Sequence, residues 1–118
     1  MVTSLPHDHG NHTLELLAQK PDQKTFNKVS DTFRLISDTT RLKILWLLCH
    51  SEECVINIAA AIDMSSPAVS HHLRVLKQAG LLMARRDGKE AYYTLADTEE
   101  AALVHKIVDS VFDMNCKR

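Results

Sequence analysis

The stretch from Ser65 to Leu82, SSPAVSHHLRVLKQAGLL, constrains the fold of this chain more than any other. Ser65 or Ser66 can cap a helix with Pro67 in its first turn, where the backbone N–H groups have no intrahelical partner anyway. Three apolar residues follow the i, i+4, i+7 spacing of one buried stripe: Val69, Leu73 and Leu76. Gly80 predicts a left-handed cap at the end of the helix.

The opposite face of this predicted helix carries small hydroxyl side chains and cations: Ser66, Ser70, His71, Arg74 and Lys77. Such a face fits a DNA major groove, because small residues let the backbone approach and cations further along meet phosphate. An amphipathic surface helix with a solvated face would show the same pattern. Adjacent side chains on a helix point about 100° apart, so His71 and His72 cannot easily share one metal ion. We interpret His71 as DNA-facing and His72 as partly packed.

The neighbouring segments extend the pattern on both sides. Residues 55–62, VINIAAAI, predict a second short helix, and a tight turn at residues 63–65 makes the pair a helix-turn-helix. Downstream, LLMARRDGKEAYYTL predicts two strands around Asp87-Gly88, a strong hairpin signal. A basic hairpin after a helix-turn-helix indicates a winged helix. The predicted DNA-contacting residues are Ser65, Ser66, Ser70, His71, Arg74 and Lys77 on the helix, and Arg85, Arg86 and Lys89 on the wing.

The charge is segregated along the chain. The whole chain has a formal net charge of −1, which argues weakly against a nucleic-acid partner. Residues 65–91, however, hold five basic and two acidic side chains, a net +3, whereas residues 97–113 hold one basic and five acidic, a net −4. A local basic patch is what DNA binding requires.

Four segments carry a resemblance to a known family: SDTTRLKILWLL, EECV, SSPAVSHHLRVLKQAGLL and RRDGKEAYYTL. Together they resemble the ArsR/SmtB family of bacterial metal-responsive repressors, from about Phe26 to the C-terminus, and VSHHLRVLKQAGL is the most specific part. The resemblance implies a homodimer that binds double-stranded operator DNA and releases it when an inducer such as zinc, cadmium or another divalent transition metal binds.

We therefore predict a mainly α fold with a small β-hairpin wing (α+β), a winged helix-turn-helix that is dimeric through its first and last helices. Residues 1–22 would form a flexible arm with a short helix over residues 13–19, and residues 23–118 the DNA-binding and dimerisation domain. The last helix, starting at Asp97 or Thr98, has an apolar stripe too broad for a 118-residue monomer, and a symmetric partner is the commonest way to cover one. The helix TRLKILWLL, capped by Ser37 or Asp38, is apolar almost all round, so Trp46 is expected in the core.

The first of two candidate metal sites lies at the start of the helix-turn-helix. There the family has a C-V-C pattern that joins ligands from the N-terminal arm, and this chain keeps one thiolate, Cys54, in Cys54-Val55-Ile56. The favoured site combines Cys54 with three histidines of the arm, and a second cysteine is a further candidate ligand: His7, His9, His12 and Cys49. Thiolate and imidazole ligands suit zinc or a similar ion. The histidines fit an unstructured tail equally well, and Cys49 fits plain core packing.

The alternative metal site lies on the last helix, where the family has a D-x-H pair and then H-x-x-H or H-x-x-E. The matching residues are Asp97 and Glu99, then Ser110 and Asp113, so the usual histidines are missing. An all-oxygen set suits a harder ion, or none. His105 and Asp109 lie four residues apart on one helical face and could form a displaced half-site. A solvated acidic face explains the same residues.

Other functional classes find little support. The chain has no phosphate-binding loop, nucleophile elbow or His-Glu-x-x-His motif, so we expect no enzyme. It also lacks an apolar run of ~20 residues and a signal-peptide core, which predicts a cytoplasmic protein without membrane contact. Three cysteines, Cys49, Cys54 and Cys116, make no disulfide framework. Two alternatives stay open: a repressor on the same fold that senses thiol oxidation, and a winged-helix interaction module that binds no DNA.

Overall fold

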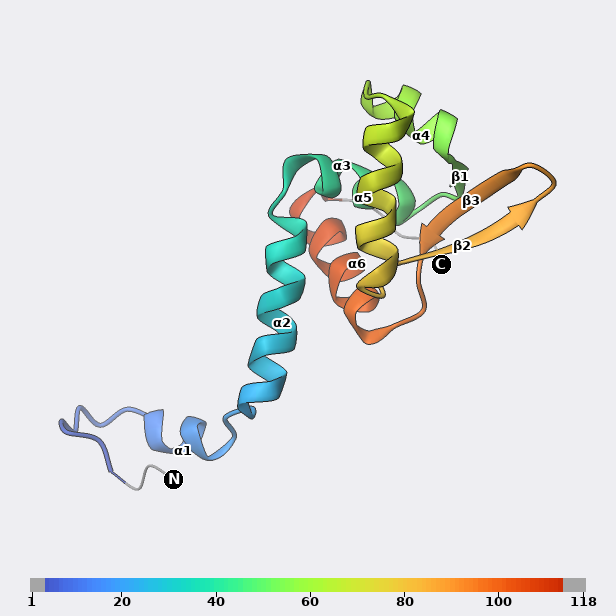
Figure 1. The fold of residues 1–118 in the computed structure, drawn as a ribbon. Coiled ribbons are helices and arrows are strands. Elements are labelled where there is room, and N and C mark those ends of the chain that lie inside the picture. Colours follow the sequence, from blue (N-terminus) through green and yellow to red (C-terminus); the bar gives the residue numbers. More distant parts are fainter. Residues whose placement is uncertain (1–3, 114–118) are drawn as a thin grey trace.

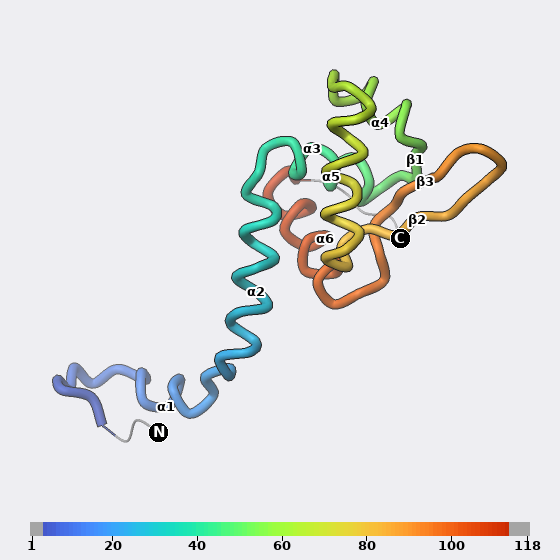
Figure 2. Tube along the Cα trace, viewed as in Figure 1, coloured from blue at the N-terminus to red at the C-terminus, as the bar shows by residue number. Residues whose placement is uncertain are grey.

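The computed structural model describes residues 4–113, with the elements in this order: α1 (Thr13–Ala18), α2 (Gln23–Ile36), α3 (Thr39–Leu48), β1 (Glu53–Cys54), α4 (Val55–Ile62), α5 (Ser66–Gln78), β2 (Leu82–Asp87), β3 (Glu90–Leu95) and α6 (Glu99–Val111). Figure 1 shows α3 to α6 and the small sheet gathered into one body, from which α2 projects and carries α1 and the N-terminal arm away. The radius of gyration is 18.6 Å, against about 13–14 Å for a compact chain of this length. The tube in Figure 2 makes the same separation visible.

Three of the helices, α3, α5 and α6, begin where a short polar side chain predicted from the sequence caps them. The side-chain oxygens of three residues each accept a hydrogen bond from a backbone N–H three residues further on: Asp38 from Arg41, Ser65 from Ala68, and Thr98 from Ala101, at 2.9, 3.3 and 3.0 Å. Each cap removes one of the orphan donors of a helix start. The sequence left two candidates for each of these caps, and the structure selects Asp38 over Ser37, Ser65 over Ser66, and Thr98 over Asp97. Gly80 follows the end of α5 with φ +80°, as predicted.

The wing is the predicted hairpin with one further strand beside it. In β2 and β3, Arg85 pairs with Tyr92 and Asp87 with Glu90, so the chain reverses at Gly88, which has φ +64°. The strand order is β1-β3-β2, and β1 pairs antiparallel with β3 through Glu53 and Cys54. The sequence did not indicate β1, because two residues are too few for an alternating pattern.

The core lies between α3, α4, α5, α6 and the base of the sheet. Its fully buried side chains include Ile44, Leu45, Leu48, Ile58, Leu73, Leu76, Val104 and Val108. The prediction for Trp46 is wrong: its side chain is 45% exposed. α3 buries only one side within the chain, and Trp46 lies on the other side with Leu42 and Phe112 at the edge of a shallow apolar groove.

The apolar stripe of α6 serves two different surfaces. Ala101, Val104 and Val108 are buried inside the chain, whereas Val111 is 68% and Phe112 44% exposed. Large apolar side chains of the first two helices are also uncovered: Leu14, Leu16, Phe26, Val29 and Phe33. We call these seven residues the uncovered apolar surface. They leave apolar area for a partner to cover.

One cation fastens α2 to the body. Lys28 Nζ lies 2.8 Å from Glu100 Oε1 and 3.5 Å from Glu99 Oε2. The hydrogen bond from Lys28 lowers the pKa of the Glu100 carboxyl, and the same bond raises the pKa of the Lys28 ammonium. The start of α6 is therefore tied to α2 by charge as well as by packing.

Candidate functional site

The second helix of the helix-turn-helix, α5, turns its apolar side into the core and its polar side outward. Val69, Leu73 and Leu76 are fully buried, so core packing fixes which side chains face solvent. On the outer side lie three exposed residues and two half-buried ones: His71, Arg74 and Lys77, and Ser66 and Ser70. Ser65 is exposed, and its hydroxyl accepts the capping hydrogen bond. The structure thus presents the predicted polar face on one accessible surface.

The His71 and His72 rings contact each other edge-on, and His72 also hydrogen-bonds to a residue of another helix. The Arg41 side chain of α3 donates from Nε to His72 Nδ1 at 3.2 Å. His72 is half-buried, whereas His71 is exposed. This contact joins α3 to α5 and confirms that His72 is partly packed.

The wing cations differ in how firmly they are held. Arg85 binds Glu52 through Nη2 and Nε, at 2.7 and 2.8 Å from Oε1, and its guanidinium carbon lies 4.7 Å from the centre of the Tyr92 ring. The hydrogen bond to Glu52 raises the pKa of Arg85. Arg86 and Lys89 are exposed, and neither has an ion pair within residues 4–113. Arg86 and Lys89 are therefore the more available wing cations, while Arg85 is tied to the segment before α4.

The predicted arm site is not assembled within one chain. Cys54 is 6% exposed at the start of α4, and Cys49 is fully buried. The arm histidines lie beyond the far end of α2, away from β1 and the sheet (Figure 1). Across residues 4–113, no group of three potential metal ligands joins a cysteine to an arm histidine. The arm site stays a prediction, and it would need an arm from another chain.

The matching acidic residues of the alternative site are also spread out. Asp97 precedes the cap of α6, Glu99 is paired with Lys28 in its first turn, and Asp113 follows its last turn. Within the part of the chain that the structure describes, these three carboxylates do not come together as metal ligands. Of the residues predicted for this site, His105 and Asp109 are the two that lie against each other.

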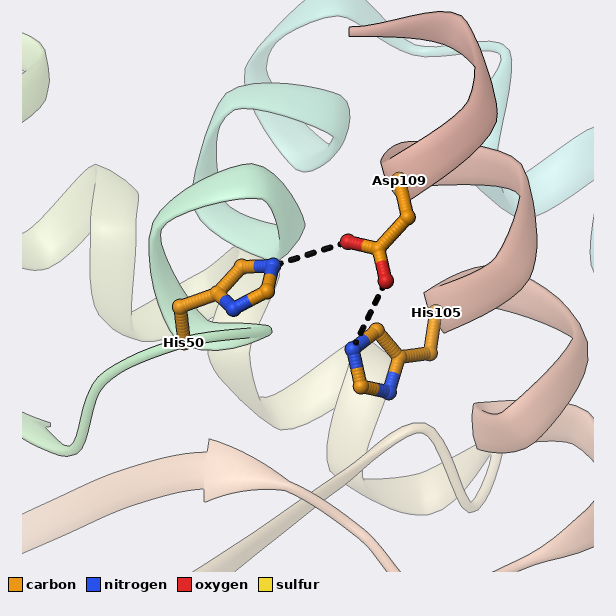
Figure 3. A group of neighbouring side chains, drawn as sticks. All are labelled: His50, His105 and Asp109. Atoms are coloured by element: carbon orange, nitrogen blue, oxygen red, sulfur yellow. Dashed lines mark hydrogen bonds and ion pairs between the residues drawn. The ribbon is translucent and has the colours of Figure 1, made fainter. Parts of the chain in front are cut away.

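His50 joins His105 and Asp109 in a compact cluster that the sequence did not reveal as a unit. His50 Nε2 lies 2.8 Å from Asp109 Oδ1, and His105 Nε2 lies 3.2 Å from Asp109 Oδ2. Figure 3 shows His50 approaching α6 from the loop after α3, with the carboxylate between the two rings. The sequence contains a signal only for the pair on α6; His50 is 59 residues from Asp109, and no local spacing connects them.

Comparison with known proteins identifies the family. The profile of bacterial regulatory proteins of the arsR family matches residues 38–83, from the cap of α3 into β2. The cadmium resistance transcriptional regulatory protein CadC homolog of Staphylococcus aureus is 37% identical over 106 residues, which make up 89% of this chain and 84% of that protein. The chain belongs to the ArsR family.

This ArsR-family protein has further relatives of known type. The transcriptional repressor SmtB homolog of Synechocystis sp. is 37% identical over 82 residues, 70% of this chain and 62% of that protein. Among solved structures, the homodimeric winged helix-turn-helix DNA-binding domain Mb0332 of Mycobacterium bovis aligns with a TM-score of 0.65 and 34% identity, covering 80% of this chain and 88% of that one. The predicted winged helix-turn-helix is confirmed. Within residues 4–113, every helix is too short or too polar to cross a lipid bilayer.

Proposed function

We propose that this protein is a homodimeric transcriptional repressor that binds double-stranded operator DNA and releases it when a divalent metal ion binds. One observation carries the DNA-binding part. Four exposed cations share the helix-turn-helix and the wing without a partner in residues 4–113: Arg74, Lys77, Arg86 and Lys89. Cations left unpaired on one surface are available to phosphate, and contacts to phosphate supply most of the affinity of such proteins for DNA.

The fold supports the following docking of the protein on DNA. α5 would lie in the major groove, where Ser70 and His71 face the base edges and Arg74 and Lys77 meet the backbone. The wing would follow the adjacent phosphates through Arg86 and Lys89. In a two-fold dimer the two copies of α5 would stand about 34 Å apart, one turn of DNA, or a multiple of that.

The uncovered apolar surface supports the dimer. Its residues come from α1, α2 and the end of α6, the first and last helices that we expect to meet a second copy. A symmetric partner would place the same surface opposite itself. The M. bovis domain of the same fold is a homodimer, which agrees with this arrangement.

The metal part of the proposal draws on the relatives and on the ligands available. The S. aureus relative is named for cadmium resistance, and cadmium and zinc both accept thiolate and imidazole ligands. Cys54 with the histidines of a second chain's arm is one candidate set, with Cys49 as a further thiolate. The other is on α6, with Asp97, Glu99, His105, Asp109 and Asp113.

The thiol-sensing alternative has less support from the described cysteines. Cys49 is fully buried and Cys54 is 6% exposed, which limits the access of an oxidant to either thiol. Cys116 lies outside the described residues.

Two titrations test the proposed function. Fluorescence anisotropy with a labelled duplex from the protein's own promoter should show tight binding at low salt and a steep fall in affinity as salt rises. Adding Zn²⁺ or Cd²⁺ at fixed salt should then release the duplex, and excess chelator should restore binding. An affinity independent of salt would instead indicate an interaction module, and unchanged DNA binding at saturating metal would refute metal release.

A further inference from the structure

We propose that His50, His105 and Asp109 form a binding site for a borderline divalent ion such as Zn²⁺ or Co²⁺, built entirely within one chain. Three potential ligand atoms, one from each residue, all lie within 4.8 Å of one another. No other such group of three occurs among residues 4–113. The regulatory part of this inference rests on the proposed function, whereas the binding site itself does not.

The spacing of the ligand atoms fits an ion of this kind. Bonds of about 2.0–2.1 Å in a tetrahedral arrangement place neighbouring ligand atoms roughly 3.3 Å apart. Here the two Nε2 atoms lie 2.8 and 3.2 Å from the two carboxylate oxygens of Asp109. Small side-chain rotations, without movement of the backbone, would therefore let all three residues reach one ion between them (Figure 3).

The chemistry of the three side chains defines the class of ion. Two imidazole nitrogens and one carboxylate oxygen match zinc, cobalt or nickel rather than calcium or magnesium, which prefer six or more oxygen ligands. Three protein ligands leave a fourth position for water. Each side chain is about a quarter exposed, at 22% for His50, 23% for His105 and 24% for Asp109. That exposure lets an ion enter, while the burial keeps the ligands in place.

The position of the cluster connects it to the DNA-binding surface. His50 lies in the short connection between α3 and β1, and the next two residues of that connection touch the wing. Thr94 of β3 donates its hydroxyl to the Ser51 carbonyl at 2.9 Å, and Glu52 holds Arg85 of β2. An ion that fixes His50 would thus act on the segment that orients the wing.

The other two ligands connect the same ion to the proposed dimer. His105 and Asp109 lie on α6, whose next residues include Val111 and Phe112 of the uncovered apolar surface. An ion bound between α3 and α6 would couple the orientation of the wing to the packing of the last helix. If it bound the DNA-free arrangement more tightly than the DNA-bound one, DNA affinity would fall by the ratio of the two metal affinities.

Metal binding by the full chain tests the site directly. Co²⁺ absorption would report coordination, and competition for Zn²⁺ with a chromophoric chelator would give affinity and stoichiometry under reducing conditions. The variants are His50→Gln, His105→Gln and Asp109→Asn, all close in size to the residues they replace. Asp31→Asn, at an exposed carboxylate on α2, is the matched control. Cys54→Ser combined with deletion of residues 1–12 separates this site from the arm site.

We expect one ion per chain in the unmodified protein, in Asp31→Asn and in the combined arm variant. Loss of any one ligand should weaken Zn²⁺ binding by at least about 10- to 100-fold, the range seen when only outer-shell partners of a metal are removed. Circular dichroism melts would confirm that each variant is folded; three separate ligands mean that one unstable variant does not decide the test.

Two outcomes overturn different statements. His50→Gln and Asp109→Asn are made both in the unmodified protein and in the combined arm variant. If the folded variants bind Co²⁺ and Zn²⁺ as tightly as their parent proteins in both cases, the site is refuted, and the proposed repressor function is untouched. If the three variants lose the ion but Zn²⁺ never releases DNA from the unmodified protein, the site stands, and the metal-release part of the proposed function is refuted. Loss of both binding and release in these variants, with both kept in the arm variant, would establish the cluster as the inducer site.

Discussion

Replacing Arg86 by alanine tests the assignment of the wing cations, and its effect can be worked out from the structure. Four available cations per chain, Arg74, Lys77, Arg86 and Lys89, would make about eight phosphate contacts in a dimer, and each contributes about 0.9 to the slope of log K against log salt. The expected slope is therefore about −7. Arg86→Ala removes two contacts per dimer and should flatten it by about 1.8.

A slope change of that size is readily measured. Between 50 and 200 mM salt, the affinity of Arg86→Ala for DNA should therefore fall by a factor about 12-fold smaller than the affinity of the unmodified protein does. Fluorescence anisotropy at five or six salt concentrations, with the operator duplex and an unrelated duplex, gives both slopes. The effect should be the same on both sequences, because a phosphate contact carries no sequence information.

Two comparisons make this prediction specific. Lys106→Ala removes an exposed cation from α6 and should leave the slope unchanged. Arg85→Ala should flatten the slope by less than Arg86→Ala, since Glu52 already holds the Arg85 guanidinium. A slope for Arg86→Ala equal to that of the unmodified protein, or a larger change for Arg85→Ala, would refute the assignment of the wing cations.

Three further predictions test the fold and the dimer. Thr98→Ala loses the cap on the Ala101 N–H, at 3.0 Å, and the hydrogen bond to the Gly80 carbonyl that follows α5, at 2.6 Å. It should lower the free energy of unfolding by about 1–3 kcal/mol in denaturant melts, and Thr98→Ser should lower it much less. Equal losses would contradict the cap. Val111 is 68% exposed in one chain, so Val111→Asp should give a folded monomer by light scattering. Val108→Asp instead places a charge in the core and should unfold the chain. A folded and dimeric Val111→Asp would contradict a dimer interface that includes α6. The backbone N–H of Arg41, which donates to Asp38, lowers the pKa of that carboxyl below 3.8, so its contribution to stability is present above pH 3.8 and is lost as pH falls through the lower, folded-state pKa. Thermal melts of Asp38→Asn against the unmodified protein should therefore converge at low pH and diverge above it, and parallel curves would contradict the assignment.

Local signals were enough to predict most of the fold. The caps at Asp38, Ser65 and Thr98, the spacing of Val69, Leu73 and Leu76, and the Asp87-Gly88 turn each act within a few residues. Such interactions are encoded by neighbouring side chains, so a sequence pattern identifies them without knowledge of the rest of the fold. The separation of the basic segment from the acidic one was likewise readable, because charge can be counted along the chain.

Burial was predicted less well than secondary structure. The helix around Trp46 is apolar on nearly every side, and its sequence does not say which side the rest of the chain will cover. Packing against α4, α5 and α6 buried Ile44 and Leu48 but left Trp46 at 45% exposure. The apolar residues of the last helix divide in the same way. Val104 and Val108 are buried within one chain, whereas Val111 and Phe112 stay exposed and available to a second copy.

Contacts between distant residues were decided by the tertiary structure alone. Arg85 meets Glu52 across 33 residues, and His50 meets Asp109 across 59. Neither pair lies on one helix or one hairpin, so no periodicity links its members. The packing of α6 beside the end of α3 brings His50 to Asp109, and the sheet, in which β1 and β2 flank β3, brings Glu52 to Arg85. The sequence by itself determined a DNA-binding winged helix and several candidate metal ligands, because those features depend on local spacing and on residue type. It did not select among the candidate ligands. Which imidazoles and carboxylates converge on one point depends on how the helices pack, and that is where His50 joins His105 and Asp109.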